Sequence, residues 1–511
     1  MGNGEKLKEE CGVFGAFSLS TSVTSYIYYG LQALQHRGQE SSGIAIYDGE
    51  KINCIKGLGL VSEVFNKENL KTLEGKMGIG HVRYSTTGSN DIINAQPLVA
   101  NFKNEYMALA HNGNLINAEE LRGQLEEDGR IFQTTTDSEI ILHLIAKNFQ
   151  KGLIEALLET IKQIKGSYAL VILTDNKLIG IRDVNSIRPL CIGKKDDTYF
   201  LSSESCAFDV IGAELIRDVE AGEIVIIDGK GIDSVKLEVE EKKMPCVFEY
   251  IYFARPDSVI DEKSVYFTRL EMGKRLAEEA PVDADLVVPV PDSGIAAARG
   301  YSLKTGIPMG EGLIKNKYIG RTFIAPDQRD RETGVRIKLN VLKELIQGKR
   351  IVLIDDSIVR GTTMKRLVSL LKNGGAKEVH VRIKLNVLKE LVQGKRIVLI
   401  DDSIVRGTTM KRLVSLLKSG GAKEVHVRIS SPPVKYSCYF GIDTPTKKEL
   451  IAARMSVDKI CKVIGADSLQ FLSIEGLIKS VGLKFICTGC FDGDYPMYVP
   501  KEGNKYLFEK T

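Results

Sequence analysis

Short apolar runs that alternate with amphipathic stretches dominate the pattern of this chain, and one combination of them stands out. Arg350 to Ile354 is a β-branched apolar run with the length of a buried parallel strand, and Thr362 to Lys372 has helical periodicity. The stretch between them is polar and rich in small and hydroxyl residues. The pattern predicts a strand that passes into a helix through a ligand-binding loop.

This loop has the composition of a phosphate-binding turn. Backbone N–H groups at a helix start can face a phosphate, and nearby hydroxyls add donors. Asp355 and Asp356 follow the strand at the edge where open α/β sheets bind ligands, and carboxylates bind sugar hydroxyls or a divalent metal. A sugar phosphate is the predicted ligand. A strand-to-helix turn with solvated acids is the alternative.

The N-terminal half has a different pattern, in which polar clusters adjoin strand-like or helical runs. Cys11 opens the first run, and Tyr26 to Gln35 is helical in pattern. The clusters are QHRGQESSG (35–43), GHVRYSTTG (80–88), AHNGNL (110–115) and TTTDSE (134–139), the last leading into an amphipathic helix. Short alternating segments from 166 to 227 predict the rest of an antiparallel α+β layer structure, and 230–245 predicts a connector.

Bulk properties restrict the class of protein. A chain of 511 residues is too long for one core, which favours two domains. A net charge of +4 without a basic block argues against nucleic acid, and no apolar run reaches membrane-spanning length. The first ten residues contain no signal-peptide pattern, so a cytoplasmic protein is expected. In that compartment, nine cysteines favour catalysis or metal binding over disulfides.

Cys11 and the N-terminal clusters together resemble the class II glutamine amidotransferase domain of the N-terminal nucleophile hydrolases. The resemblance covers Cys11 to about Cys246 and implies a four-layer αββα fold and removal of leader residues 1–10. Cleavage before Cys11 would free an α-amine with a pKa of about 8, close to that of a thiol, so the residue could supply both nucleophile and base.

The same resemblance implies roles for four further residues. Arg83 would bind the glutamine α-carboxylate and Asp137 the α-ammonium, while the Asn112 side chain and the Gly113 N–H would form an oxyanion hole. Taken singly, these residues have simpler interpretations. Arg83 could form a surface ion pair, and Asn-Gly is most often a hairpin turn.

The C-terminal half resembles a type I phosphoribosyltransferase. A predicted helix, Thr268 to Glu279, and a strand, Leu286 to Val290, precede a turn that resembles the family's pyrophosphate loop. Mg²⁺ would bind Ser293, Asp355 and Asp356. The other residues implied for phosphoribosyl pyrophosphate are Ser357, Arg360, Gly361, Thr362 and Thr363 in the loop, and Lys315, Lys317 and Arg321 in a mobile flap. The basic flap could also be a solvated face.

A tandem repeat departs from this family pattern. Residues 336–381 and 382–427 are 46-residue units that differ only at Ile346/Val392 and Asn373/Ser419. The second copy therefore offers an equivalent site at Asp401, Asp402, Ser403, Arg406, Gly407, Thr408 and Thr409. A ribose can occupy one place only, so we expect one copy to be extruded. The first copy is favoured for the site because it keeps its spacing to the flap.

The order of the two domains resembles a family of glutamine-dependent enzymes that aminate phosphoribosyl pyrophosphate. The expected domains are 11–245, 246–480 and a C-terminal segment, 481–511. The expected products are 5-phosphoribosylamine, glutamate and pyrophosphate, in the first committed step of de novo purine synthesis. The family also implies feedback inhibition by purine nucleotides and a homotetramer. Two other functions stay open: a glutaminase disabled in its second domain by the repeat, and a non-catalytic sensor of phosphoribosyl pyrophosphate.

Four cysteines suggest an additional cofactor. Cys487 and Cys490 form a C-x-x-C pair, which alone could bind zinc, act in redox chemistry or be incidental. With Cys246 and Cys438 they match the positions of the 4Fe-4S ligands in a bacillus-like branch of the family, which implies such a cluster. Zinc is the alternative, because four thiolates also suit it.

Overall fold

The N-terminal half of the chain folds into two antiparallel sheets that pack face to face. In this computed structural model, the first sheet has the strand order β11 (Glu214–Asp218), β9 (Cys191–Lys195), β10 (Thr198–Ser202), β1 (Gly12–Ser18), β4 (Met77–Arg83), β2 (Ser41–Tyr47) and β3 (Ile52–Leu58). The second has the order β13 (Gly231–Lys236), β12 (Glu223–Asp228), β8 (Leu178–Arg182), β7 (Gly166–Thr174), β6 (Glu105–Leu115) and β5 (Leu98–Phe102).

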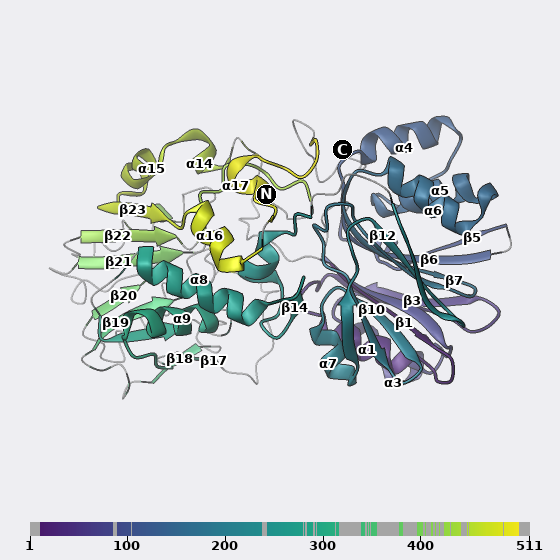
Figure 1. The fold of residues 1–511 in the computed structure, drawn as a ribbon, viewed down its shortest axis with the longest axis horizontal. Helices are drawn as coiled ribbons and strands as arrows, with labels where there is room; N and C mark the ends of the chain where they lie inside the picture. The colour runs from purple at the N-terminus through teal and green to yellow at the C-terminus, as the bar shows by residue number, and fades with distance from the viewer. Residues whose placement is uncertain are drawn as a thin grey trace.

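Helices cover the outer face of each sheet, which gives four layers (Figure 1). The first sheet is covered by α1 (Thr24–Ala33) and α7 (Cys206–Ile211), with the short helices α2 (Val61–Val64) and α3 (Lys67–Leu70) nearby. The second is covered by α4 (Ala118–Glu127), α5 (Ser138–Asn148) and α6 (Leu153–Gln163). All nine residues of β7 are buried because it lies between the other sheet and these helices. The predicted αββα fold is confirmed.

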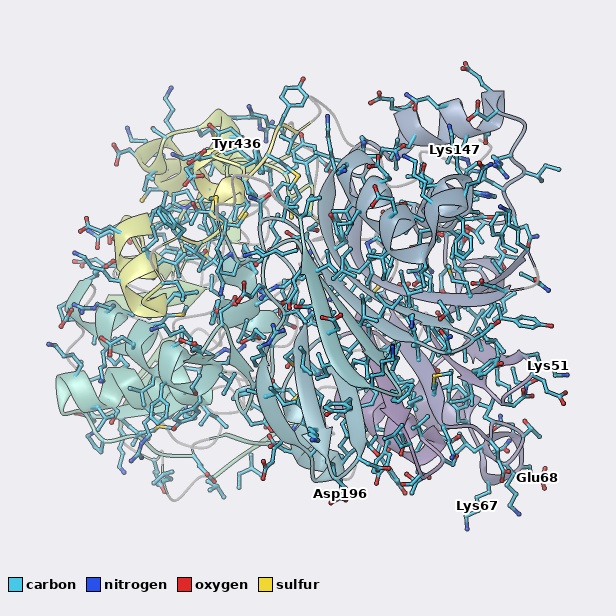
Figure 2. All side chains as sticks on the ribbon, turned by 45° about the vertical axis from the view of Figure 1, so that its right-hand side comes forward. Lys51, Lys67, Glu68, Lys147, Asp196 and Tyr436 are labelled. Carbon is cyan, nitrogen blue, oxygen red and sulfur yellow. The ribbon has the colours of Figure 1, made fainter. Side chains whose placement is uncertain are left out.

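The structure describes residues 11–84, 89–103, 105–237, 243–279, 284–289, 294–311, 313–315, 339–342, 349–354, 378–381, 396–401, 424–429, 431–440, 449–483 and 485–499, with isolated residues between these ranges. Charged residues on the outside of the sandwich, among them Lys51, Lys67, Glu68 and Lys147, extend away from the layers (Figure 2). Within the described residues, no helix has both the length and the apolar character that crossing a bilayer requires.

Parallel strands form the core of the C-terminal half. The order β16 (Leu286–Pro289), β19 (Arg350–Ile354), β20 (Glu378–Val381) makes one sheet, and β21 (Arg396–Asp401), β22 (Glu424–Ile429), β23 (Ser468–Phe471) makes another. The surrounding elements are α8 (Val265–Glu279), α9 (Ile295–Thr305), α14 (Ile451–Arg454), α15 (Val457–Ile464), α16 (Ile474–Val481), α17 (Gly489–Asp492) and two short antiparallel strand pairs, β14 (Val259–Ile260) with β15 (Lys263–Ser264) and β17 (Leu313–Lys315) with β18 (Leu339–Val341).

Both copies of the repeat contribute strands, so the predicted extrusion of one copy is wrong. The first copy supplies β19 and β20 and the second supplies β21 and β22, and Figure 1 shows β20 beside β21 in one layer. Every strand of a parallel sheet offers its neighbour the same hydrogen-bonding edge, so an additional pair of strands fits into the middle. This arrangement avoids exposing the apolar face of a whole βαβ unit.

The predicted connector at 230–245 is partly wrong. Gly231–Lys236 forms β13, which pairs with β12 in a regular antiparallel register from Glu223↔Lys236 to Asp228↔Gly231. The charged residues misled the prediction because β13 is an edge strand with partly exposed side chains, where polar residues are tolerated. The change of domain therefore falls after this strand.

Candidate active sites

Cys11 lies at the end of the central strand of the first sheet. It immediately precedes β1, which pairs with β4 in a register that places Gly12 opposite Val82. Its side chain is buried, and its Sγ donates to the carbonyl oxygen of Tyr84 at 3.3 Å. The sheet thus places the thiol next to the segment that follows Arg83. Leader residues 1–10 lie outside the described residues.

Asn112 lies in the second sheet and has a side chain available to a ligand. Asn112 and Gly113 pair with Ala169 and Tyr168 inside the long ladder between β6 and β7, which rules out the hairpin-turn interpretation. The Asn112 side chain is 1% exposed, and its Nδ2 group has no hydrogen-bond partner among the residues that the structure describes. Because a buried unpaired amide is costly, such a group suggests a bound acceptor.

Gly113 must be a glycine at this position. Its φ is +155°, and a Cβ there would lie 2.0 Å from the carbonyl oxygen of Ser167. No side chain can be accommodated at that distance. The backbone at Gly113 therefore passes close to the backbone of Ser167 and Tyr168 on β7, an approach that only glycine allows.

Arg83 and Asp137 are both buried, so Arg83 does not form a surface ion pair. Arg83 is 2% exposed and donates to the carbonyl oxygen of Ser89 at 3.2 Å. Asp137 is 3% exposed, and its Oδ2 accepts from the N–H of Leu115 at 2.8 Å. The first contact fixes the end of β4 and the second fixes Asp137 to the end of β6. One buried cation and one buried carboxylate suit a zwitterionic ligand.

Two buried histidines connect the sheets behind these residues. A His81 ring nitrogen lies 3.0 Å from the carbonyl oxygen of His111, which joins β4 to β6. Burial lowers the pKa of His111 and lowers that of His81 to about 3. Both rings are therefore neutral at physiological pH and serve as hydrogen-bonding links between the layers.

Arg37 connects Cys11 to the C-terminal half, a role that was not predicted although Arg37 lies in the polar cluster 35–43. Its Nε donates to the carbonyl oxygen of Cys11 at 3.0 Å, and its two terminal nitrogens bind the Glu249 carboxylate at 2.9 and 2.7 Å. Glu249 belongs to the π-helical turn η3 (Glu249–Phe253). Glu204 accepts a fourth bond from Arg37 at 2.6 Å. Burial alone would raise the pKa of Glu204, but His36 and Arg37 hold it well below its usual value.

The four predicted cysteine ligands come together where the two halves of the chain meet. Cys246 and Cys487 form a parallel β-bridge, and Cys490 lies close enough to Cys246, Cys438 and Cys487 to interact with all three electrostatically. Burial raises the pKa of Cys487 to about 12. Among the described residues, no group of three or more His, Cys, Asp or Glu side chains is close enough to hold a single metal ion.

The segment around Cys438 also contacts the N-terminal half. The carbonyl oxygen of Tyr439 accepts from the Asn114 side chain at 3.1 Å, and that of Phe440 accepts from Ser167 Oγ at 2.7 Å and from Arg188. Asn114 follows the Asn112-Gly113 pair directly. The contact between Asn114 and Tyr439 therefore connects the segment of Cys438 to the strand that carries the candidate oxyanion site.

Most of the predicted sugar-phosphate residues cannot be placed. Outside the described residues lie Ser293, Lys317, Arg321, Asp355, Asp356, Ser357, Arg360, Gly361, Thr362 and Thr363, and in the second copy Asp402, Ser403, Arg406, Gly407, Thr408 and Thr409. Lys315 and Asp401 end β17 and β21, and only their backbones are described. The strands that lead to these loops are described, and they fix where each loop begins.

The strand order separates the two candidate loops. β16 and β19 are neighbours, and Pro289 pairs with Ile354, so these two strands end side by side immediately before the predicted pyrophosphate loop and the first Asp-Asp pair in the sequence. Asp401 ends β21, which lies beyond β20. β21 therefore belongs to a different set of paired strands from β16, and it contacts the far strand, β20, of the sheet that contains β16.

Comparison with known proteins agrees with both halves of this description. Residues 81–210 match the family model of a glutamine amidotransferase domain, and residues 271–388 and 381–431 each match that of a phosphoribosyl transferase domain. Amidophosphoribosyltransferase from Methanothermobacter thermautotrophicus is 46% identical over 507 residues, which cover 98% of this chain and 97% of the relative. The Bacillus subtilis enzyme of that name is 46% identical over 497 residues, covering 96% and 94%.

Solved structures agree with these relatives. The B. subtilis glutamine phosphoribosylpyrophosphate amidotransferase, complexed with ADP and GMP, superposes with a TM-score of 0.79 at 43% identity and covers 98% of this chain and 100% of that one. A structure described as the allosteric regulatory enzyme of purine biosynthesis gives a TM-score of 0.80 at 44% identity, with 98% and 99% coverage.

Proposed function

The chain belongs to the amidophosphoribosyltransferase family, and we propose that Cys11 begins its reaction by attacking the carboxamide carbon of glutamine. The enzyme transfers ammonia from glutamine to phosphoribosyl pyrophosphate, which is the first committed step of purine nucleotide synthesis. The Cys11 α-amine, freed by removal of residues 1–10, takes the thiol proton. Collapse of the tetrahedral adduct breaks the C–N bond, and ammonia leaves with the proton that the α-amine had taken, which gives a thioester. Water then hydrolyses the thioester, which releases glutamate and restores the thiol.

The observation that carries this proposal is the buried Asn112 amide. Its unpartnered Nδ2 donor supports a role in binding the oxyanion that forms when the thiolate adds to the carboxamide. The Gly113 N–H supplies the second donor. In this scheme Arg83 binds the α-carboxylate of glutamine and Asp137 its α-ammonium, consistent with the burial of one charge of each sign.

Asn112→Ala is expected to lower kcat for glutamine hydrolysis by about 10²- to 10³-fold with little change in KM, because the lost donor acts mainly on the transition state. Glutamate release measured at varied glutamine concentration tests this. Asn148→Ala is the matched control, since Asn148 Nδ2 is also buried without a partner but lies at the end of α5. A change in KM alone would contradict the oxyanion role.

The second half of the reaction is assigned to the first copy of the repeat. The adjacency of β16 and β19 favours a site built from Asp355, Asp356 and the loop 357–363, with Lys315, Lys317 and Arg321 closing over the diphosphate. Ammonia passes inside the protein and attacks C1, and pyrophosphate leaves. Ser293, Asp355 and Asp356 would hold Mg²⁺, for which hard oxygen ligands are suited, and the ion would stabilise the leaving group when bound.

Cys246, Cys438, Cys487 and Cys490 are proposed as the ligands of a 4Fe-4S cluster. Their convergence in a buried, largely apolar region supports this donor set, and each thiolate in such a cluster binds a different iron atom, so the four need not meet at one point. The cluster would join the C-terminal segment to the junction between domains. This structural role requires no redox step.

Protein purified without oxygen is expected to contain about four iron atoms and four acid-labile sulfides per chain. Cys490→Ala should lose most of this iron. Cys461→Ala should retain it, because Cys461 lies on α15, outside the group, and its Sγ donates to the carbonyl oxygen of Ala466 at 3.2 Å. Metal analysis that finds zinc and no sulfide would assign the four thiolates to the zinc alternative.

Further properties are proposed from the family. They are inhibition by purine nucleotides, as suggested by the B. subtilis complex with ADP and GMP, a homotetrameric assembly and a cytoplasmic location. A non-catalytic sensor of phosphoribosyl pyrophosphate would not need the buried groups around Cys11. A chain restricted to glutaminase activity is distinguished by assaying pyrophosphate release with ammonia as the nitrogen donor.

A further inference from the structure

Two buried amides on one short segment lie behind the candidate glutamine site. Asn94 ends the 3-10 turn η1 (Ile92–Asn94), and Gln96 follows two residues later, before β5. Their exposed fractions are 0% and 4%. Neither residue belongs to the motifs that identified the domain, yet the side chains of both contact the segments that carry those motifs.

Asn94 connects the segment after Arg83 to the segment before Asp137. Its Nδ2 donates to the carbonyl oxygen of Ser89 at 3.1 Å and to Thr135 Oγ1 at 2.9 Å, and its Oδ1 accepts from the Thr135 N–H at 3.0 Å. The Ser89 carbonyl is also the acceptor for the Arg83 guanidinium at 3.2 Å. One side chain therefore fixes a partner of Arg83 and a backbone group two residues from Asp137.

Gln96 makes a second connection to the same region. Its Oε1 accepts from the His111 N–H at 2.7 Å, and its Nε2 donates to Ser138 Oγ at 3.1 Å. The His111 ring nitrogen Nδ1 lies 3.0 Å from the same Ser138 hydroxyl. His111 precedes Asn112 and Ser138 follows Asp137. Gln96 thus holds the strand segment next to Asn112 and the start of the helix next to Asp137 at a fixed distance from each other.

These contacts require primary amides. Each side chain donates and accepts at the same time, which neither a carboxylate nor an apolar group can do. Because both are buried, removal of either leaves backbone or hydroxyl groups unpaired, and the surrounding segments must shift to satisfy them. The α-carboxylate and α-ammonium of an amino acid are attached to one carbon, so their binding groups must keep a fixed separation.

We infer that Asn94 and Gln96 are positioning residues that set the separation between the Arg83 and Asp137 groups and thereby determine recognition of the α-amino acid end of glutamine. The inference rests on the proposed roles of Arg83 and Asp137. Neither amide touches the substrate in this scheme. Both act through groups that do.

Asn94→Ala and Gln96→Ala are each expected to raise KM for glutamine on the order of tenfold, with kcat within about threefold of the unmodified enzyme. The KM for glutaramate, which lacks the α-amine, should rise less than the KM for glutamine. The ratio of kcat/KM for glutamine to that for glutaramate is therefore expected to fall in both variants. Ammonia-dependent synthesis on the same samples corrects for any unfolded fraction. Glutamate or glutarate release at varied substrate concentration gives these constants.

Asn117→Ala is the matched control. Asn117 also bridges two segments by donating to the Gln163 carbonyl at 2.9 Å and accepting from the Lys165 N–H at 2.9 Å, but it joins α4 to the start of β7. Asn117→Ala should leave the preference for glutamine over glutaramate unchanged. If Asn94→Ala and Gln96→Ala lower only the folded fraction or kcat, the positioning role is wrong. If Arg83→Ala and Asp137→Ala also leave KM unchanged, the proposed glutamine site itself fails.

Discussion

Cys11→Ala is expected to lower glutamine-dependent synthesis of 5-phosphoribosylamine by more than about 10³-fold, while synthesis from ammonia continues. The thiol is the only group in the scheme that forms a bond to the carboxamide carbon, so no neighbouring residue can replace it. Ammonia enters the reaction after that step and does not need the thiol. Pyrophosphate release with each nitrogen donor measures both activities on one sample.

Cys54→Ala is the matched control for this experiment. Cys54 is a free thiol on β3 of the same sheet, and burial raises its pKa to about 11, so it is not a nucleophile at neutral pH. Both activities should survive its replacement. Loss of the ammonia-dependent activity in Cys11→Ala, with the protein still folded, would contradict the division of the reaction into two sites.

The paired replacement of Asp355 and Asp356 by asparagine is expected to lower ammonia-dependent synthesis by at least about 10²-fold, because these carboxylates bind the ribose hydroxyls and Mg²⁺ in the proposed site. The same replacement of Asp401 and Asp402 should leave the rate within about twofold. The two loops have identical sequences, so the comparison tests position in the sheet and nothing else. Pyrophosphate release with saturating ammonia is the assay.

The two double replacements should differ because the strands before the two Asp-Asp pairs have different neighbouring strands. The first Asp-Asp pair begins beside the loop that follows β16, whereas the second begins on β21, with β19 and β20 between it and β16. A ligand that carries a 5′-phosphate and a diphosphate needs the loop that follows β16 together with one Asp-Asp loop. The reverse result would assign the site to the second copy. An unmodified chain with no ammonia-dependent activity would support the glutaminase-only alternative.

Local sequence patterns predicted the elements around the sites well. The run Arg350 to Ile354 is β19, the helix that begins at Ser138 starts within the TTTDSE cluster, and the αββα layers match the family expectation. These predictions succeeded because strand length, burial and helical periodicity are properties of consecutive residues. The roles of individual side chains in the sites stay predictions.

Interactions between distant segments could not be predicted in this way. Asn112-Gly113 has the local pattern of a turn, but pairing with β7 holds it in an extended strand. Arg37 lies 212 positions from Glu249, and Asn94 lies 41 from Thr135, so no window of sequence contains both partners. A buried arginine or amide has the same local pattern as an exposed one. The polar cluster around Arg37 was the one available signal.

The repeat was misjudged for a related reason. We expected a surplus unit to be extruded because a ribose site has one position, but a sheet has no such limit. β16 pairs with a strand of the first copy and β23 with a strand of the second, so both outer neighbours keep the partners that a single unit would provide. The two three-stranded sheets lie next to each other through β20 and β21, and the pairing at β16 and at β23 is kept.

This arrangement has a consequence for inheritance. Since the two units are almost identical, a deletion of 46 consecutive residues that begins anywhere in the first copy gives nearly the same shortened chain, whatever its breakpoint. That chain would pair β16 directly with the strand before the remaining loop, and the following strand with β23. Many different deletions thus converge on one foldable product, so we expect the duplicated form to revert readily in a growing population.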